Sequence, residues 1–190
     1  RTFVAFLLSA NFGEVVLFAV AILAGLGAPM TVVQVLVVNL LTDGLPAVAL
    51  ARDPASPDTM RRPPQGLGTL LGRELSAILG IAGLTVGLAA TGAYLAGREL
   101  EPDAAQTMAF ATVALAELVL VFAVRSPRSP AWRAGRNPAL ILAVAGSVLV
   151  VAASIYLPLG RELLETASLG PAELAIVLLL ALLPTAVLEA

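Results

Sequence analysis

At 190 residues, with 59% hydrophobic and only 13% charged side chains, the chain is far more apolar than a soluble globular domain, which indicates a membrane protein. Cysteine and histidine are both absent, which excludes disulfides, thiolate or histidine metal sites, and cysteine or histidine nucleophiles. The net charge of −2 carries no information by itself, and we expect no nucleic-acid partner.

Apolar runs separated by glycine and proline predict an all-α, polytopic membrane helix bundle over residues 1–190, with about six transmembrane helices. The expected helices are 2–25, 30–50, 74–96, 105–124, 138–157 and 171–189. The expected breaks are Gly25–Pro29, the proline-rich stretch 52–73, the acidic turn 98–103, the segment 125–138, and Pro158–Pro171.

The first helix carries a polar interruption at residues 9–14. Asn11 and Glu14 are spaced i, i+3, so they share one face of the helix. A carboxylate in the middle of a membrane span costs several kcal/mol and normally faces the interior of the bundle, where it marks an ion or substrate path. We therefore expect Asn11 and Glu14 to point inward.

The second helix has a similar interruption at residues 39–46. Asn39, Thr42 and Asp43 are spaced i, i+3, i+4 and share a face. Pro46 cannot donate to the carbonyl of residue 42, and Gly44 loosens the same turn, so we expect a distorted helix from Asp43 to Pro46. Gln34, about one turn from this cluster, is left without an assigned role.

The third and fourth helices complete the expected interior. Gly80, Gly83 and Gly87 line one face of the third helix, and we expect them to approach Gly13 of the first helix closely. Glu117 is a further acid in the middle of the fourth helix, and we expect it to face inward as well.

The distribution of arginine predicts the orientation in the membrane, because loops rich in basic residues stay in the cytoplasm. All 11 basic residues are arginine. Nine lie at the start of the chain and around 52–73 and 125–137, whereas only Arg98 and Arg161 lie on the other side. Both termini should therefore be cytoplasmic.

The intramembrane polar residues suit hard cations such as calcium, which prefer oxygen ligands. A lone asparagine or threonine in a membrane helix more often bonds neighbouring helices together. Three acids accompanied by amides at helical spacing favour a cation site instead. The candidate metal ligands are Asn11, Glu14, Asn39, Thr42, Asp43 and Glu117.

The stretches 9–16 and 38–47 closely resemble the fifth and sixth transmembrane helices of type II P-type cation-transporting ATPases, the group that includes calcium pumps. The stretch 60–64, Met-Arg-Arg-Pro-Pro, resembles the motif of the following cytoplasmic loop. The resemblance runs from the fifth to the tenth helix of the family and weakens after about residue 125. It implies that Asn11, Glu14, Thr42, Asp43 and Glu117 match one calcium site, and that Asn39 and Asp43 match part of a second.

The resemblance also shows which family parts this sequence lacks, since it has no phosphorylation motif, nucleotide domain or actuator domain. We read the chain as a fragment that is inactive alone, whose ATP and magnesium would bind in missing domains. Its expected partners are the lipid bilayer, the transported cation and the amino-terminal part of the pump, including its first four helices. The expected location is a bacterial-type plasma membrane. The alternatives are a stand-alone membrane protein derived from such a pump, or a secondary cation transporter.

Overall fold

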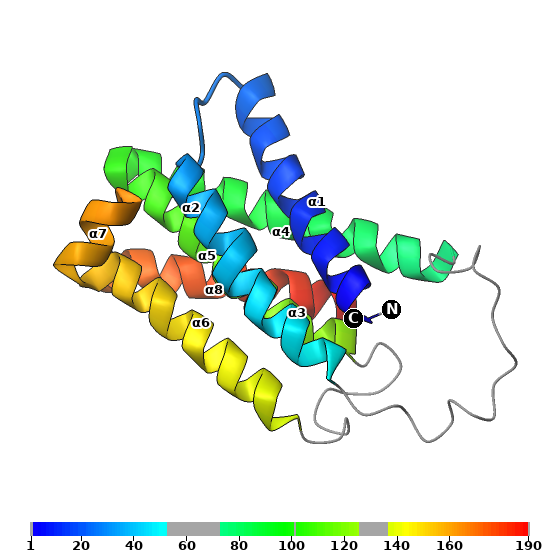
Figure 1. The fold of residues 1–190 in the computed structure, drawn as a ribbon. Helices are drawn as coiled ribbons and strands as arrows, with labels where there is room; N and C mark the ends of the chain where they lie inside the picture. Colours follow the sequence, from blue (N-terminus) through cyan, green and yellow to red (C-terminus); the bar gives the residue numbers. More distant parts are fainter. Residues whose placement is uncertain (1, 53–72, 101, 126–136, 190) are drawn as a thin grey trace, which may run out of the picture.

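The computed structural model describes residues 2–52, 73–100, 102–125 and 137–189, and every regular element in these ranges is helical (Figure 1). The elements are α1 (Thr2–Leu23), α2 (Val32–Val37), the π-helical turn η1 (Val38–Asp43), α3 (Gly44–Ala51), α4 (Arg73–Leu100), α5 (Pro102–Arg125), α6 (Pro138–Tyr156), α7 (Pro158–Leu164) and α8 (Pro171–Glu189). Within the described ranges, six helical spans are long and apolar enough to cross a membrane. The elements α2, η1 and α3 count as one of them, because they form one continuous span. This confirms the predicted all-α bundle.

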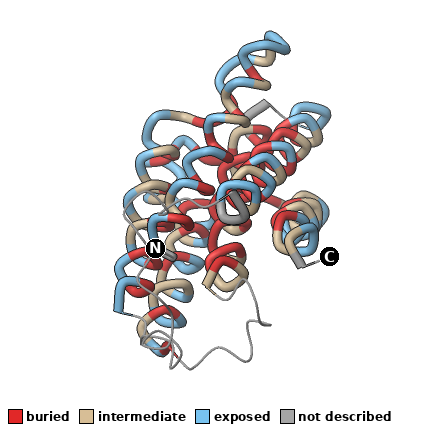
Figure 2. Tube along the Cα trace, turned by 90° about the vertical axis from the view of Figure 1, so that its right-hand side faces the viewer, coloured by how far each residue is buried: buried red, intermediate tan, exposed pale blue. Residues whose placement is uncertain are grey.

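Helix α5 forms the centre of the bundle. It packs against α4 and α8 and also meets α1, η1 and α6. In its membrane span 78% of the residues are buried, compared with 17% in the span of α8. Figure 2 shows the buried residues gathered in the interior, with exposed residues on the outer faces of the helices. The outward apolar faces therefore have the composition expected for contact with lipid.

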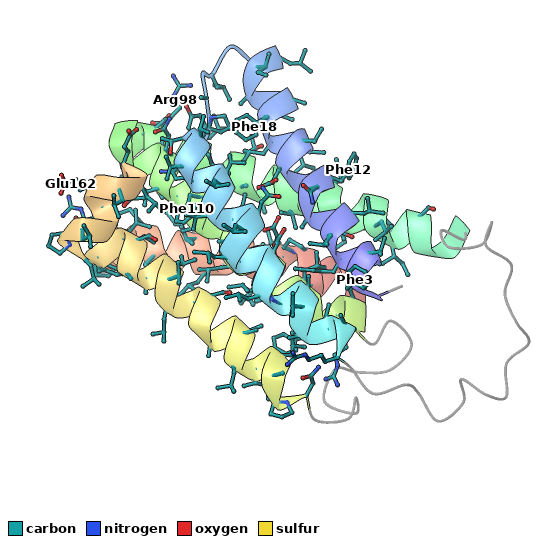
Figure 3. All side chains as sticks on the ribbon, viewed as in Figure 1. Phe3, Phe12, Phe18, Arg98, Phe110 and Glu162 are labelled. Carbon is teal, nitrogen blue, oxygen red and sulfur yellow. The ribbon has the colours of Figure 1, made fainter. Side chains whose placement is uncertain are left out.

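Helices α1 and α4 cross in close contact through glycine. A Cβ atom on Gly87 would lie 2.7 Å from the carbonyl oxygen of Gly13, and one on Gly83 would lie 2.8 Å from the carbonyl oxygen of Ser9. Phe12, labelled in Figure 3, covers Gly83 from the α1 side. The predicted contact of α1 with the glycines of the third helix is thus confirmed at Gly83 and Gly87. A Cβ on Gly80, however, would meet no atom within 4 Å.

The loop between α1 and α2 turns through two glycines in the left-handed region, Gly25 with φ 64° and Gly27 with φ 86°. Two side chains of the α4–α5 hairpin hold this loop. The Tyr94 hydroxyl donates to the Leu26 carbonyl at 2.9 Å, and the Gln106 amide donates to the Ala28 carbonyl at 3.0 Å. The end of the first span is thereby fixed relative to α4 and α5.

Helix α7 lies where the sequence predicted only a break between the fifth and sixth spans. Pro158 starts this helix, because proline at the first helical position loses no hydrogen bond. The helix ends at Leu164, and the next residue, Glu165, has a φ of 53° in the left-handed region. Two threonines attach the segment that follows: Thr166 donates to the Ser154 carbonyl, and Thr107 of α5 accepts from the backbone N–H of Ala167. Arg98 in the last turn of α4 and Glu162 of α7 lie at the same end of the bundle (Figure 3).

The Arg-Pro-Pro motif predicted at 60–64 lies outside the described ranges. Of the predicted arginine-rich loops at 52–73 and 125–137, only the end residues are described. The cytoplasmic placement of both termini depends on those loops, and it stays a prediction.

Candidate cation-binding site

The second span contains a wide turn that carries three of the candidate ligands, Asn39, Thr42 and Asp43. Residues Val38–Asp43 form a π-helical turn, and a regular α-helix resumes at Gly44. The expected distortion is therefore present, but it extends over Val38–Asp43 and overlaps the expected segment Asp43–Pro46 only at Asp43. A π turn inserts one residue into a helix and often occurs at functional sites. Here it contains all three candidate ligands of the second span.

Proline explains why the distortion lies on this side. Pro46 has no N–H, so it cannot donate to the carbonyl four residues earlier, as in an α-helix, or five residues earlier, as in a π-helix. The carbonyl five residues earlier belongs to Leu41. It accepts a hydrogen bond at 3.1 Å from the Ser147 hydroxyl of α6. A side chain of another helix thus adds a hydrogen bond next to the Thr42 carbonyl, which Pro46 leaves without its α-helical donor.

Asp43 and Glu117 form the most buried part of the site. Asp43 is 1% exposed and Glu117 of α5 is 0% exposed. Among the described residues, no donor reaches any of their four carboxylate oxygens, although the two carboxyl groups are close enough to hydrogen-bond to each other when one is protonated. Unpaired buried carboxylates are costly. This pair therefore requires either a proton or a cation.

Glu14 and Asn39 form a second pair, between α1 and η1. The Asn39 amide donates to both carboxylate oxygens of Glu14 at 2.8 Å, and also to the Val35 carbonyl at 3.1 Å. Glu14 is 7% exposed, and its charge acts on both Asp43 and Glu117. The three predicted acids therefore do converge on one region, from three different spans.

The remaining candidate ligands are bonded within their own helices. The Thr42 hydroxyl is buried and donates to the Val38 carbonyl at 2.7 Å, which leaves its oxygen lone pairs available. Asn11 is exposed, and its amide donates to the Leu7 carbonyl at 2.7 Å. The expectation that Asn11 points inward is wrong for this chain. Residues three apart on a helix differ by about 60° in direction, so Glu14 can face the bundle while Asn11 lies at its edge.

The carboxylates are near one another without forming a closed cage. Within the described ranges, no set of three acidic side chains is close enough to hold one metal ion. The donors present, two unpaired carboxylates, a third carboxylate bound to an amide and a hydroxyl, are hard oxygen ligands of the kind that calcium accepts. Binding an ion by all of them would require the carboxylates to move together and Asn39 to turn its carbonyl oxygen toward the ion.

Sequence reasoning missed two residues around this region. Ser147 was not singled out, because no pattern in the sequence connects this serine of α6 with the Leu41 carbonyl to which it donates. Gln34 was left unassigned, yet it is fully buried. Its amide donates to the Leu164 carbonyl at 3.0 Å, and its carbonyl oxygen completes a capping box with Thr31 at the start of α2.

Comparison with known proteins identifies the family. The family described as "Cation transporting ATPase, C-terminus" matches residues 27–190. The chain belongs to this family. As an integral, multi-pass membrane segment it corresponds to the carboxy-terminal transmembrane region of a P-type ATPase, which confirms the resemblance carried by residues 9–16 and 38–47.

Similar proteins include several calcium-transporting ATPases. A "Calcium-transporting ATPase" of Bacillus subtilis is 35% identical over 190 residues, which cover 97% of this chain and 21% of that protein. The mouse "Calcium-transporting ATPase type 2C member 2" is 30% identical, over 92% of this chain and 19% of its own length. A "P-type sodium-transporting ATPase4" of Plasmodium falciparum is 49% identical over 65 residues, or 34% of this chain and 5% of that protein. The chain thus spans about a fifth of the length of the first two relatives.

Proposed function

We propose that this chain is the ion-binding and translocating membrane portion of an ATP-driven cation pump, and that the transported ion is calcium. The observation that carries the proposal is the buried pair Asp43 and Glu117, whose oxygens have no donor, beside Glu14. The bacterial and mouse relatives are named as calcium-transporting ATPases, which supports calcium in particular.

The donor set supports this choice of ion on chemical grounds. Carboxylates, an amide oxygen and a hydroxyl are the ligands that calcium takes, and carboxylate charge contributes most to its affinity. We assign Glu14, Asn39, Thr42, Asp43 and Glu117 as ligands, with the buried, unpaired carboxylates of Asp43 and Glu117 at the centre. The π-helical turn also gives the site a backbone segment whose helical pitch can change as an ion enters or leaves.

Asn11 belongs to this proposal in a different way. It is a polar side chain on the exposed side of a membrane helix, where contact with lipid is unfavourable. We assign it to the surface that the amino-terminal part of the pump covers, with its amide oxygen added to the site on assembly. ATP and magnesium would bind in that other part, and its phosphorylation would switch these helices between inward-facing and outward-facing states.

Transport by the complete ATPase polypeptide tests the proposal. Inside-out vesicles that contain it should accumulate radioactive calcium when ATP is added, and calcium should stimulate formation of the phosphorylated enzyme. Sodium in place of calcium is the matched control, because one relative is named for sodium transport. If sodium stimulates phosphorylation and calcium does not, the transported ion is sodium and the proposal of calcium is wrong. If no cation stimulates phosphorylation, the proposal of a cation pump is refuted.

The genomic sequence distinguishes the pump from the alternative of a stand-alone membrane protein. An open reading frame that extends upstream of Arg1 into a phosphorylation motif and a nucleotide domain supports the pump. A start codon directly before Arg1 would contradict it. The 190-residue chain alone should hydrolyse no ATP in either case.

A further inference from the structure

The structure contains one polar contact between α6 and the wide turn of the second span. The Ser147 hydroxyl, on a residue that is 0% exposed, donates to the Leu41 carbonyl at 3.1 Å. Ser147 lies 106 residues from Leu41 in sequence and belongs to a helix that carries none of the candidate ligands. Figure 1 shows α6 running alongside α3, and α6 contacts both η1 and α3.

The contact ties the wide turn to a neighbouring helix. The backbone changes from π-helical at Asp43 to α-helical at Gly44, and Pro46 in the α-helical part has no N–H to donate to the Thr42 carbonyl. Inside a membrane no water restores a lost hydrogen bond, so this junction is held by fewer hydrogen bonds of its own backbone. The Ser147 hydroxyl adds a hydrogen bond from α6 at the carbonyl directly before Thr42.

The bonded carbonyl directly precedes two of the candidate ligands. The peptide group between Leu41 and Thr42 carries both the carbonyl that Ser147 holds and the backbone of Thr42, which leads on to Asp43. Fixing the direction of this peptide fixes the start of the Thr42–Asp43 segment. The Thr42 hydroxyl is itself bonded to Val38 within the same wide turn, so the turn is held from both sides.

We propose that Ser147 is a positioning residue for the cation site, which holds the wide turn in the pitch that presents Thr42 and Asp43 to the ion. This rests on the proposed function, and it adds a residue of the α6 helix that touches no ion. Loss of the hydroxyl should weaken cation binding without removing any ligand.

A matched serine on the same helix provides the control. Ser154 lies seven residues further along α6, so it faces nearly the same direction, and it is 4% exposed. Its hydroxyl donates to Val150 of its own helix at 2.8 Å. Ser147→Ala and Ser154→Ala therefore remove the same atom from similar buried positions, but only the first affects the second span. Ser147→Thr keeps the hydroxyl and should restore the wild-type behaviour.

The experiment measures phosphorylation from ATP in the complete polypeptide as a function of calcium concentration. Ser147→Ala should raise the calcium concentration for half-maximal phosphorylation by about threefold to tenfold, with the maximal level unchanged. Ser154→Ala should match the wild type.

The outcomes separate the two proposals. A wild-type enzyme without any cation-dependent phosphorylation refutes the proposed function, and this inference with it. A calcium-dependent wild type with Ser147→Ala and Ser154→Ala equal in half-maximal concentration overturns the role of Ser147 alone. A variant that only loses thermal stability or maximal phosphorylation, at unchanged half-maximal calcium, also overturns it, because that is the result of a purely structural serine.

Discussion

The crossing of α1 and α4 allows a quantitative prediction, because two glycines of α4 differ only in what faces them. A Cβ atom on Gly87 would lie 2.6 Å from Val16 Cβ and 2.7 Å from the Gly13 carbonyl oxygen. A Cβ atom on Gly80 would meet nothing within 4 Å. Carbon atoms prefer to be about 3.5–4.0 Å apart, so Gly87→Ala must push the helices apart by about 1 Å.

The expected cost follows from these distances. Overpacking of a well-packed contact destabilises by about 1–3 kcal/mol. Alanine also gains about 0.5–1 kcal/mol over glycine in a helix, and Gly80→Ala receives this gain without any clash. Both variants receive the helix gain, so they should differ by the overpacking cost of about 1–3 kcal/mol, which for a chain of this size corresponds to about 2–12 °C in Tm.

Thermal unfolding of the purified chain in detergent micelles, followed by circular dichroism at 222 nm, measures the difference. Gly87→Ala should unfold below the wild type and Gly80→Ala at or above it. Equal Tm values for the two variants would show that α1 and α4 do not meet at Gly87, and the packing account would be refuted.

Three further predictions concern single side chains. Gln34→Leu should lower the stability of the chain by about 1–2 kcal/mol, seen as a lower Tm, since both the bond to Leu164 and the capping box with Thr31 are lost; an unchanged Tm would contradict this. Glu165→Gly should raise Tm by relieving about 1 kcal/mol of left-handed strain, whereas a lower Tm would show that the side chain itself is needed. In the complete polypeptide, Thr42→Ala should weaken calcium-dependent phosphorylation only partly, because a hydroxyl is a neutral ligand; complete loss would give Thr42 a larger role than this account assigns.

The number of spans was predictable because it depends on local composition. A run of about 20 apolar residues must cross the membrane as a helix whatever its neighbours do. The close approach at Gly83 and Gly87 was predictable for a similar reason, since small residues at helical spacing leave a groove. Gly80 lies outside the contact because α1 crosses α4 at an angle, and a crossing angle cannot be read from the spacing of glycines (Figure 1).

The candidate site was predictable in its acids and less so in its details. The cost of an acid in a membrane span predicts that Glu14, Asp43 and Glu117 face the interior, and all three are buried. The same rule fails for Asn11. Its spacing shows that Asn11 shares a helix face with Glu14, but not which edge of that face meets the bundle. Pro46 signals a distortion but not its extent over Val38–Asp43, and only tertiary structure brings Ser147 of α6 to the Leu41 carbonyl.

The central claim is that Asp43 binds the transported ion, and substitution by its amide tests this most directly. Asp43→Asn keeps the size of the side chain and removes the charge that contributes most to calcium affinity. In the complete polypeptide it should abolish calcium-dependent phosphorylation from ATP, while Glu99→Gln, an exposed acid at the end of α4, should leave phosphorylation unchanged. Calcium-dependent phosphorylation that survives Asp43→Asn at unchanged calcium affinity would contradict the assignment of Asp43 as a ligand.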